Sequence, residues 1–189
     1  MKRSLENRRG LAPYASACAI ALGAVTLAWS ENAAAENTLG VAVDFADGVD
    51  QSGTASGAGA EVYFGPRMNL VLIDLTTELN GGFHTFGGDF DPAMYKLTAG
   101  GRFAIDLVIR PSVFAHIGVG HLRYNDLLTG DREGRTNLAG DLGVALDLSL
   151  IPHIDFGLHG SYNVLAGGAN SDAFKWYQAG AHVTFAFDG

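Results

Sequence analysis

Ionisable side chains recur at alternate positions along the chain, a spacing that brings them onto one face of a β-sheet. Asp155, His159 and His182 are the first candidates for chemistry, because carboxylate and imidazole groups bind metal ions and exchange protons. The same groups serve as partners in buried ion pairs, which charged side chains need wherever water is excluded. The sequence lacks the compact ligand spacing of zinc motifs. We therefore predict a structural network, without a metal site and without a cofactor.

The predicted network is drawn from the ionisable residues that the alternation assigns to one face, a face that also carries Asp44 and Glu78. Its members are Glu61, Asp74, Lys96, Arg102, His116, Asp141, Asp147, Asp155, His159 and His182. Since unpaired charges are costly away from water, we expect these acids and bases to be paired with one another.

The alternation that would position these residues is clearest between Thr136 and Tyr162. Apolar residues such as Leu142 alternate there with small, acidic and hydroxyl residues, and a period of two indicates β-strands. Pro152 lies between two such runs, so the stretch predicts a hairpin. Counting from this turn places Asp147 opposite Asp155, and two facing carboxylates require a cation or a shared proton between them.

The rest of the chain continues the same pattern, and we predict eight strands in all. Outside the hairpin at 136–162, they lie at 38–45, 56–64, 69–79, 94–105, 112–124 and 174–187. Short turns are expected at Gly65 to Arg67 and at 106–111, and a slip or bulge is expected at the far end of the fifth strand. Longer loops are expected at 46–55, 80–92, 125–135 and 165–173. An up-and-down chain that gathers its long loops at one end is typical of an outer-membrane barrel.

The composition of the two faces indicates which one points outward. The face with the ionisable residues is otherwise rich in Gly, Ala, Ser and Thr, which suits the narrow inside of an eight-stranded barrel. Strands of about ten residues match a tilted crossing of the hydrocarbon layer. We therefore expect the apolar face to meet lipid. The alternative is a soluble, lipocalin-like secreted carrier, whose apolar face would line the inside.

Aromatic residues lie near both ends of the predicted strands on the apolar face. Those expected to form two girdles at the membrane surfaces are Phe45, Phe64, Tyr95, Phe103, Phe156, Tyr162, Tyr177, Phe185 and Phe187. Aliphatic residues and Ala lie between them, as in transmembrane barrels.

The N-terminal segment predicts export from the cytoplasm. Basic residues precede an apolar run from about Leu11 to Trp29, and Ala33 to Ala35 follow it, which is typical of a secretory signal peptide. We predict a signal peptide at 1–35 and one barrel domain at 36–189. The only cysteine, Cys18, lies in the first segment, so we expect no disulfide in the barrel. The formal net charge of −8 argues against nucleic acid as a partner.

The chain resembles the small eight-stranded outer-membrane barrels of the OmpA type. The segment from Tyr177 to Phe187 is the most similar, because it alternates and ends in an aromatic residue. The resemblance implies an all-β, closed, eight-stranded antiparallel up-and-down transmembrane barrel in a Gram-negative outer membrane. It also implies contact with outer-membrane lipid and lipopolysaccharide, recognition by the barrel-assembly machinery, and a monomer.

We expect a non-enzymatic protein with a plugged polar lumen and a structural or surface-interaction role. The segment Gly81 to Gly88, expected in a loop, would offer aromatic residues for recognition. One alternative is a narrow pore or small-molecule conduit. Another is a lipid A-modifying hydrolase, because His159 and Ser161 resemble the His and Ser of the eight-stranded lipid A deacylases, with Asp172 as a third member. Their inward placement argues against that activity.

Overall fold

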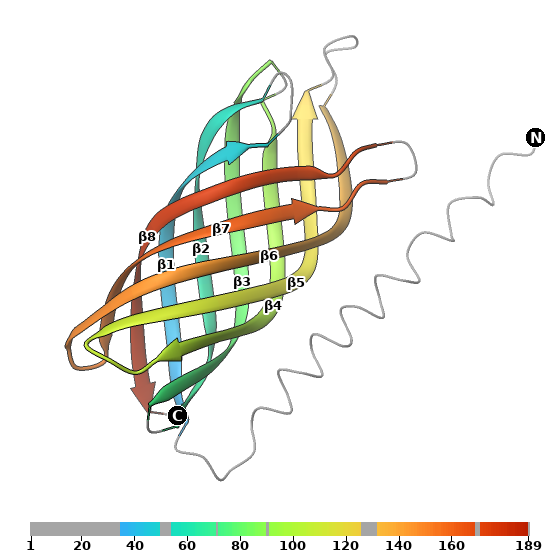
Figure 1. Cartoon of the computed structure of the whole chain (residues 1–189). Coiled ribbons are helices and arrows are strands. Elements are labelled where there is room, and N and C mark those ends of the chain that lie inside the picture. Colours follow the sequence, from blue (N-terminus) through green and yellow to red (C-terminus); the bar gives the residue numbers. More distant parts are fainter. Residues whose placement is uncertain are drawn as a thin grey trace, which may run out of the picture.

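The chain forms one antiparallel sheet of eight strands (Figure 1). The computed structural model describes residues 35–49, 54–70, 72–89, 91–125, 132–168 and 171–188. The strands are β1 (Ala35–Gly48), β2 (Thr54–Leu70), β3 (Ile73–Gly88), β4 (Ala93–Ile105), β5 (Ile109–Asn125), β6 (Arg132–Ile151), β7 (Ile154–Leu165) and β8 (Phe174–Asp188). Apart from Ala35, where β1 begins, the predicted signal peptide lies outside the described residues. No helix in the described part of the chain is long and apolar enough to cross a membrane.

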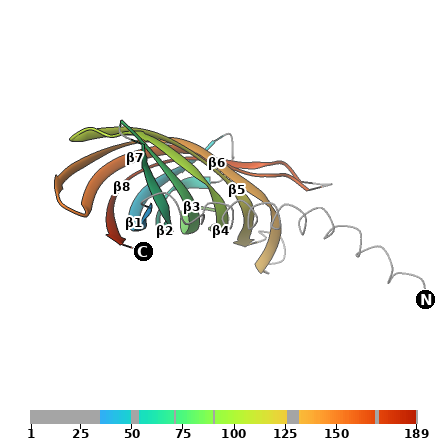
Figure 2. The same cartoon turned by 90° about the horizontal axis from the view of Figure 1, so that it is seen from below.

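The sheet closes on itself because the first strand pairs with the last. Each strand pairs with its neighbour in the chain, and β1 also pairs with β8, for example at Phe45↔Ala179. Figure 2 shows the strands from below, following one another around a ring. The predicted closed, eight-stranded, up-and-down architecture is confirmed.

The predicted turn at Gly65 to Arg67 is wrong and the one at 106–111 is shorter than predicted, because strands run through prolines that we expected to end them. β2 continues past Pro66, which lies opposite Asn37 in the ladder with β1. Its register with β3 is the same before and after Pro66. Likewise, Pro111 lies inside β5 opposite Leu146. A proline removes one ladder hydrogen bond, and the other pairs of these long strands keep the register in spite of that loss.

The predicted loop at 80–92 is also wrong, since β3 continues to Gly88. Phe83 points outward and is 40% exposed, whereas His84 and Phe86 point inward and are buried. The segment expected to be a recognition loop is therefore part of the barrel wall. The other longer connections are likewise shorter than predicted. They are still gathered at the end opposite the β2–β3, β4–β5 and β6–β7 turns.

The register differs from the prediction at two further places. β5 pairs with β6 without a register shift from Ile109↔Leu148 to Asn125↔Arg132, so the expected slip in the fifth strand is absent. A shift instead occurs between Leu148 and Ile151 in the pairing of β6 with β7. Because the turn lies at Pro152 and His153 and not at Ile151, Asp147 lies opposite Gly157, and the predicted pairing of Asp147 with Asp155 is wrong.

A closed polar lumen as the candidate functional site

All ten ionisable residues predicted for the lumen occupy inward positions. Eight of them are buried, and Arg102 and His159 are half-buried. The strands bring them together because alternate residues of every strand face the barrel axis. Their contacts divide the polar part of the lumen into four connected groups.

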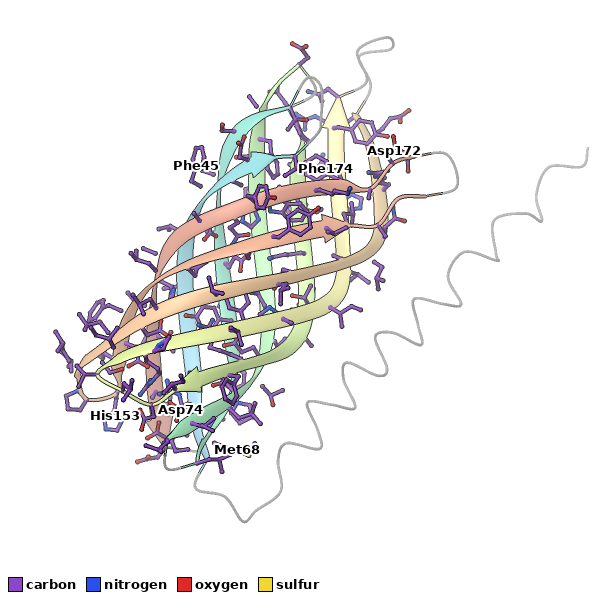
Figure 3. All side chains as sticks on the ribbon, viewed as in Figure 1. Phe45, Met68, Asp74, His153, Asp172 and Phe174 are labelled. Carbon is purple, nitrogen blue, oxygen red and sulfur yellow. The ribbon has the colours of Figure 1, made fainter. Side chains whose placement is uncertain are left out.

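The first group lies at the short-turn end, where Asp74 is found in Figure 3. Asp155 Oδ2 accepts hydrogen bonds from Arg110 Nη1 at 2.9 Å and from Arg67 Nη2 at 3.1 Å. Arg110 Nε is 3.2 Å from Asp74 Oδ2. The two arginines therefore offset the charges of two carboxylates that lie on strands β3 and β7.

The second group is centred on Glu78, which comes from β3 and is buried. Arg102 Nε donates to Glu78 Oε1 at 2.7 Å, and His116 Nε2 lies 2.9 Å from Glu78 Oε2. The other nitrogen of His116, Nδ1, lies 2.6 Å from Asp141 Oδ1. Both nitrogens of this imidazole face carboxylate oxygens, so the hydrogen-bond pattern is satisfied by the doubly protonated ring. The Arg102 guanidinium also lies 5.3 Å from the ring centre of Tyr63.

The third group is a chain of four side chains across the lumen. His159 Nε2 lies 2.6 Å from Asp44 Oδ1, and His182 Nε2 lies 2.5 Å from Asp147 Oδ1. The two Nδ1 atoms are 3.1 Å apart. Since each Nε2 donates to a carboxylate, a hydrogen bond between the two Nδ1 atoms requires one shared hydrogen. His159 and His182 are close, as predicted, but Asp44 and Asp147 are their partners instead of Asp155.

The fourth group surrounds Lys96 of β4. Its ammonium group lies 2.7 Å from Glu61 Oε1, 2.9 Å from Asn163 Oδ1 and 3.3 Å from Asp141 Oδ2. Glu61 accepts further hydrogen bonds from Asn80 at 2.8 Å and from Gln178 at 2.9 Å. Next to this group, possible ligand atoms of Asp44, Glu61 and His84 lie within 4.8 Å of one another.

An apolar cluster fills the lumen at the long-loop end, and we call it the stopper. It consists of Ala46, Phe86, Met94, Leu122, Ala139, Leu165, Phe174 and Trp176. The Trp176 ring is fully buried, with its centre 5.6 Å from the Phe174 ring and 6.2 Å from the Phe86 ring. The expectation of a polar lumen is therefore wrong at this end.

Around Glu78 the filled lumen contains little free space. A cavity of about 20 Å³ lies among Tyr63, Glu78, Arg102 and their neighbours in the described structure. A space of about 10–15 Å³ is the minimum for one water molecule. This part of the lumen is therefore packed with side chains, whereas a space of about 410 Å³ opens at the short-turn end among Arg67, Arg110 and Asp155.

The outward face is apolar along the middle of the strands. Leu142 is 65% exposed, whereas its neighbour Asp141 is 8% exposed. A lipocalin-like carrier would show the opposite arrangement, so that alternative is excluded by the side-chain orientation. In Figure 3, Phe45 points away from the barrel near the long-loop end.

The predicted girdle residues lie on this outward face. Eight of the nine are exposed, and Tyr162 is half-buried. Neighbouring rings contact one another at both ends of the barrel, with centres 6.5 Å apart for Phe64 and Phe187 and 5.2 Å apart for Tyr162 and Tyr177. Phe83 joins the long-loop girdle through Tyr95 at 4.9 Å.

The residues considered for lipid hydrolysis do not form a triad in the structure. The ring nitrogens of His159 bond to Asp44 and His182, while Ser161 Oγ accepts a hydrogen bond from Asn163 at 2.8 Å. Asp172 lies in the exposed connection before β8 (Figure 3). The side chains thus lack the nucleophile–base contact that acyl transfer requires.

Four charged or ionisable lumen residues were missed by the sequence analysis. Arg67, His84 and Arg110 lay in segments predicted as turns or loops, although alternation continues through all three. Asp44 was assigned to the inward face but was not included among the network residues. Following the alternation beyond Gly and Pro would have found them.

Comparisons with known proteins agree with this architecture. No protein-family model matches the sequence, and no curated protein is similar to it in sequence. The structure of Neisserial surface protein A (NspA) superposes with a TM-score of 0.68 and 16% identity, covering 80% of this chain and 97% of that chain. The outer membrane enzyme PagL superposes with a TM-score of 0.53 and 16% identity, covering 76% and 97%. This chain therefore has the fold of the eight-stranded outer-membrane β-barrel proteins.

Proposed function

We propose that this protein is an integral barrel of a bacterial outer membrane, with a closed lumen and a structural or surface-interaction role. In this proposal it is a non-enzymatic monomer. Outer-membrane lipid and lipopolysaccharide surround it, and the barrel-assembly machinery inserts it. The connections at the long-loop end face the cell exterior and carry any surface contact.

The observation that carries the proposal is the opposite character of the two faces of one wall. Leu142, Val144 and Leu146 are all at least 51% exposed, while Asp141 and Asp147, which flank this run in β6, are buried. In water such an outer face would expose a large apolar area, which soluble monomers avoid. In a bilayer it meets acyl chains, and barrel closure pairs the backbone groups.

A closed lumen favours this role over a pore. The stopper blocks the long-loop end, and ion pairs cross the lumen below it. We expect the purified protein in planar bilayers to show no stable single-channel conductance above that of the bare membrane. Stable, reproducible conductance steps would contradict a closed lumen and would favour the conduit.

The proposed location can be tested on the same preparation. We expect the protein to fractionate with the outer membrane and to change its gel mobility on heating, because closed barrels resist detergent until they are boiled. Recovery in the periplasmic fraction, without a heat-dependent shift, would overturn the proposal.

The proposed lack of enzymatic activity rests on the separation of His159 and Ser161 in the hydrogen-bond network. Overexpression should leave the acylation of lipid A unchanged, and His159→Ala should behave as the wild type does. Loss of an acyl chain in the wild-type strain, abolished by His159→Ala or Ser161→Ala, would establish a hydrolase instead.

A further inference from the structure

Three buried side chains from adjacent strands converge beneath the stopper. Asp44 of β1 lies opposite Gly59 of β2, and Gly59 lies opposite His84 of β3. Glu61 follows Gly59 by two residues on the same inward face of β2. The sheet register therefore places one imidazole and two carboxylates around the same point in the lumen.

His84 is the most unusual member of this group. It is fully buried, yet neither ring nitrogen has a hydrogen-bond partner among the described residues, and the same holds for Asp44 Oδ2. Buried polar atoms without partners are rare, because each one costs the full desolvation of the group. Two such atoms on facing residues indicate that something else binds between them.

The separations in this group are too long for hydrogen bonds and suit a shared ion. His84 Nε2 lies 3.5 Å from Asp44 Oδ2 and 3.8 Å from Glu61 Oε1. Good N–H···O bonds span about 2.7–3.2 Å. Two ligand atoms in a tetrahedral zinc site, each about 2.0–2.2 Å from the metal, lie about 3.3–3.6 Å apart. Small movements of the three side chains would bring their ligand atoms to the separations of a tetrahedral zinc site.

We propose that Asp44, Glu61 and His84 form a binding site for a divalent first-row transition-metal ion of the zinc class. One imidazole with two carboxylates suits such ions better than calcium or magnesium, which prefer oxygen ligands alone. Three protein ligands leave a fourth position for water. The site is independent of the role proposed above, since a closed barrel does not require a metal.

Neighbouring residues already hold the two carboxylates in place. Asp44 Oδ1 bonds to His159 Nε2 at 2.6 Å, which leaves Oδ2 directed at His84. Asn80 donates to Glu61 Oε2 at 2.8 Å and Gln178 donates to Oε1 at 2.9 Å. Metal-binding carboxylates are commonly oriented by such outer hydrogen bonds.

Gly59 provides the space that His84 occupies. A Cβ atom at Gly59 would lie 2.0 Å from His84 Cδ2 and 2.6 Å from its Nε2. Any side chain at this position would displace the imidazole from its place opposite Asp44. Gly59→Ala is therefore a way to disturb the site without removing a ligand.

The charge of the lumen favours uptake of a cation. The described lumen holds seven carboxylates, those of Asp44, Glu61, Asp74, Glu78, Asp141, Asp147 and Asp155. Four Lys and Arg side chains face them, those of Arg67, Lys96, Arg102 and Arg110. The hydrogen bonds of His116 and of the His159–His182 pair account for two further protons, and part of the negative excess remains.

Lys96 competes for one of the ligands, because its Nζ lies 2.7 Å from Glu61 Oε1. It does not depend on Glu61 alone, since Asn163 and Asp141 lie 2.9 Å and 3.3 Å from the same atom. On metal binding Lys96 keeps these two partners.

The test is zinc binding to the full chain, untagged and folded into detergent micelles in the presence of Zn²⁺, so that entry into the closed lumen is not limiting. After removal of free metal we expect one zinc per folded chain. Cobalt in its place should give visible absorption bands of a low-coordinate site. His84→Gln and Gly59→Ala should each weaken zinc binding by about 100-fold or more, the upper end of the effect of removing outer-shell partners.

His121→Gln is the matched control, because this histidine bonds to Thr136 outside the lumen cluster. It should retain one zinc per chain. Heat-dependent gel mobility verifies that each variant is folded. Should His84→Gln fail to fold, Asp44→Asn, which keeps the shape of the side chain, must show the same loss. Absence of stoichiometric zinc in the folded wild type, or equal zinc in His84→Gln, Gly59→Ala and wild type, would overturn the proposal.

Discussion

The polar part of the lumen and the stopper close the same barrel by different physical means. Both carboxylate oxygens of Glu78 have a specific partner, so the arrangement is held by direction and charge. In the stopper, Trp176, Phe86 and their neighbours are held by packing alone. The difference teaches that a closed lumen can be built from either chemistry, but that the two should respond differently to substitution.

His84 marks the boundary between the two regions. Its ring centre lies 6.2 Å from that of Trp176 in the stopper, while its Nε2 faces Asp44 in the polar part. Loss of one partner in a charged pair leaves a buried charge, whereas loss of an apolar group leaves a void. We therefore expect the polar part to be the less tolerant of single changes.

The largest effect is expected for Glu78→Ala. This change leaves Arg102 and His116 without their shared carboxylate, and breaking a buried pair costs about 3–5 kcal/mol. We expect a reduced free energy of unfolding in urea, measured in micelles by the transition midpoint. Glu133→Ala, on an exposed hydrogen bond to Tyr124, is the control and should cost less than about 0.5 kcal/mol. Equal losses of stability in the two variants would contradict the claim that the buried charged pairs are sensitive to single changes.

Trp176→Ala, in the stopper, should reduce the free energy of unfolding less than Glu78→Ala does. Truncation of a buried Trp costs about 3 kcal/mol where neighbours relax into the space, which is the low end of its usual range. Trp176→Phe should cost less still, because it conserves apolar packing. Urea unfolding measures both. A cost of Trp176→Phe as great as that of Trp176→Ala would show that packing alone does not hold this region.

A smaller effect is expected when a methyl group is added to the polar part. A Cβ at Gly157 would lie 2.1 Å from Asp147 Oδ1 and 2.5 Å from His182 Nε2. Gly157→Ala must therefore displace this pair, and forced overpacking costs about 2 kcal/mol. Gly160→Ala is the matched control on the same strand, since its Cβ would meet only Gln178 O at 3.6 Å. The prediction is wrong if the two variants unfold at the same urea concentration.

The smallest effect is expected for Tyr63→Phe. Tyr63 Oη and Thr184 Oγ1 are 2.6 Å apart and share one hydrogen bond. Its loss should cost about 1 kcal/mol, because both groups are neutral. The ring remains beneath Arg102, so the shape of the lumen is kept. A loss as large as that of Glu78→Ala would show that neutral and charged contacts are not distinguishable here.

The sequence was sufficient to predict the barrel and the sidedness of its wall. Alternation from Leu138 to Leu148 fixes which residues share a face, and that information is local. Strand ends were less predictable. Proline usually marks a turn or a strand end. Pro66 and Pro111 nevertheless lie inside strands, because the residues on either side of each one pair with the neighbouring strands.

The composition of the lumen was predicted better than its contacts. Partners such as Arg67 and Asp155 come from strands far apart in the chain, and only closure of the ring brings them together. The stopper was missed for a related reason. Alternation gives the face of Trp176, but the height at which the lumen changes from polar to apolar depends on the stagger of all eight strands.

The central claim is that the apolar outer face lies among acyl chains. A nitroxide spin label at Val144→Cys, in protein lacking Cys18 and folded into phospholipid bilayers, tests it directly. We expect the label to be accessible to molecular oxygen and shielded from a water-soluble nickel complex, while a label at His153→Cys in the β6–β7 turn meets the nickel complex. Val144 labels that meet the nickel complex as readily as His153 labels would contradict the account.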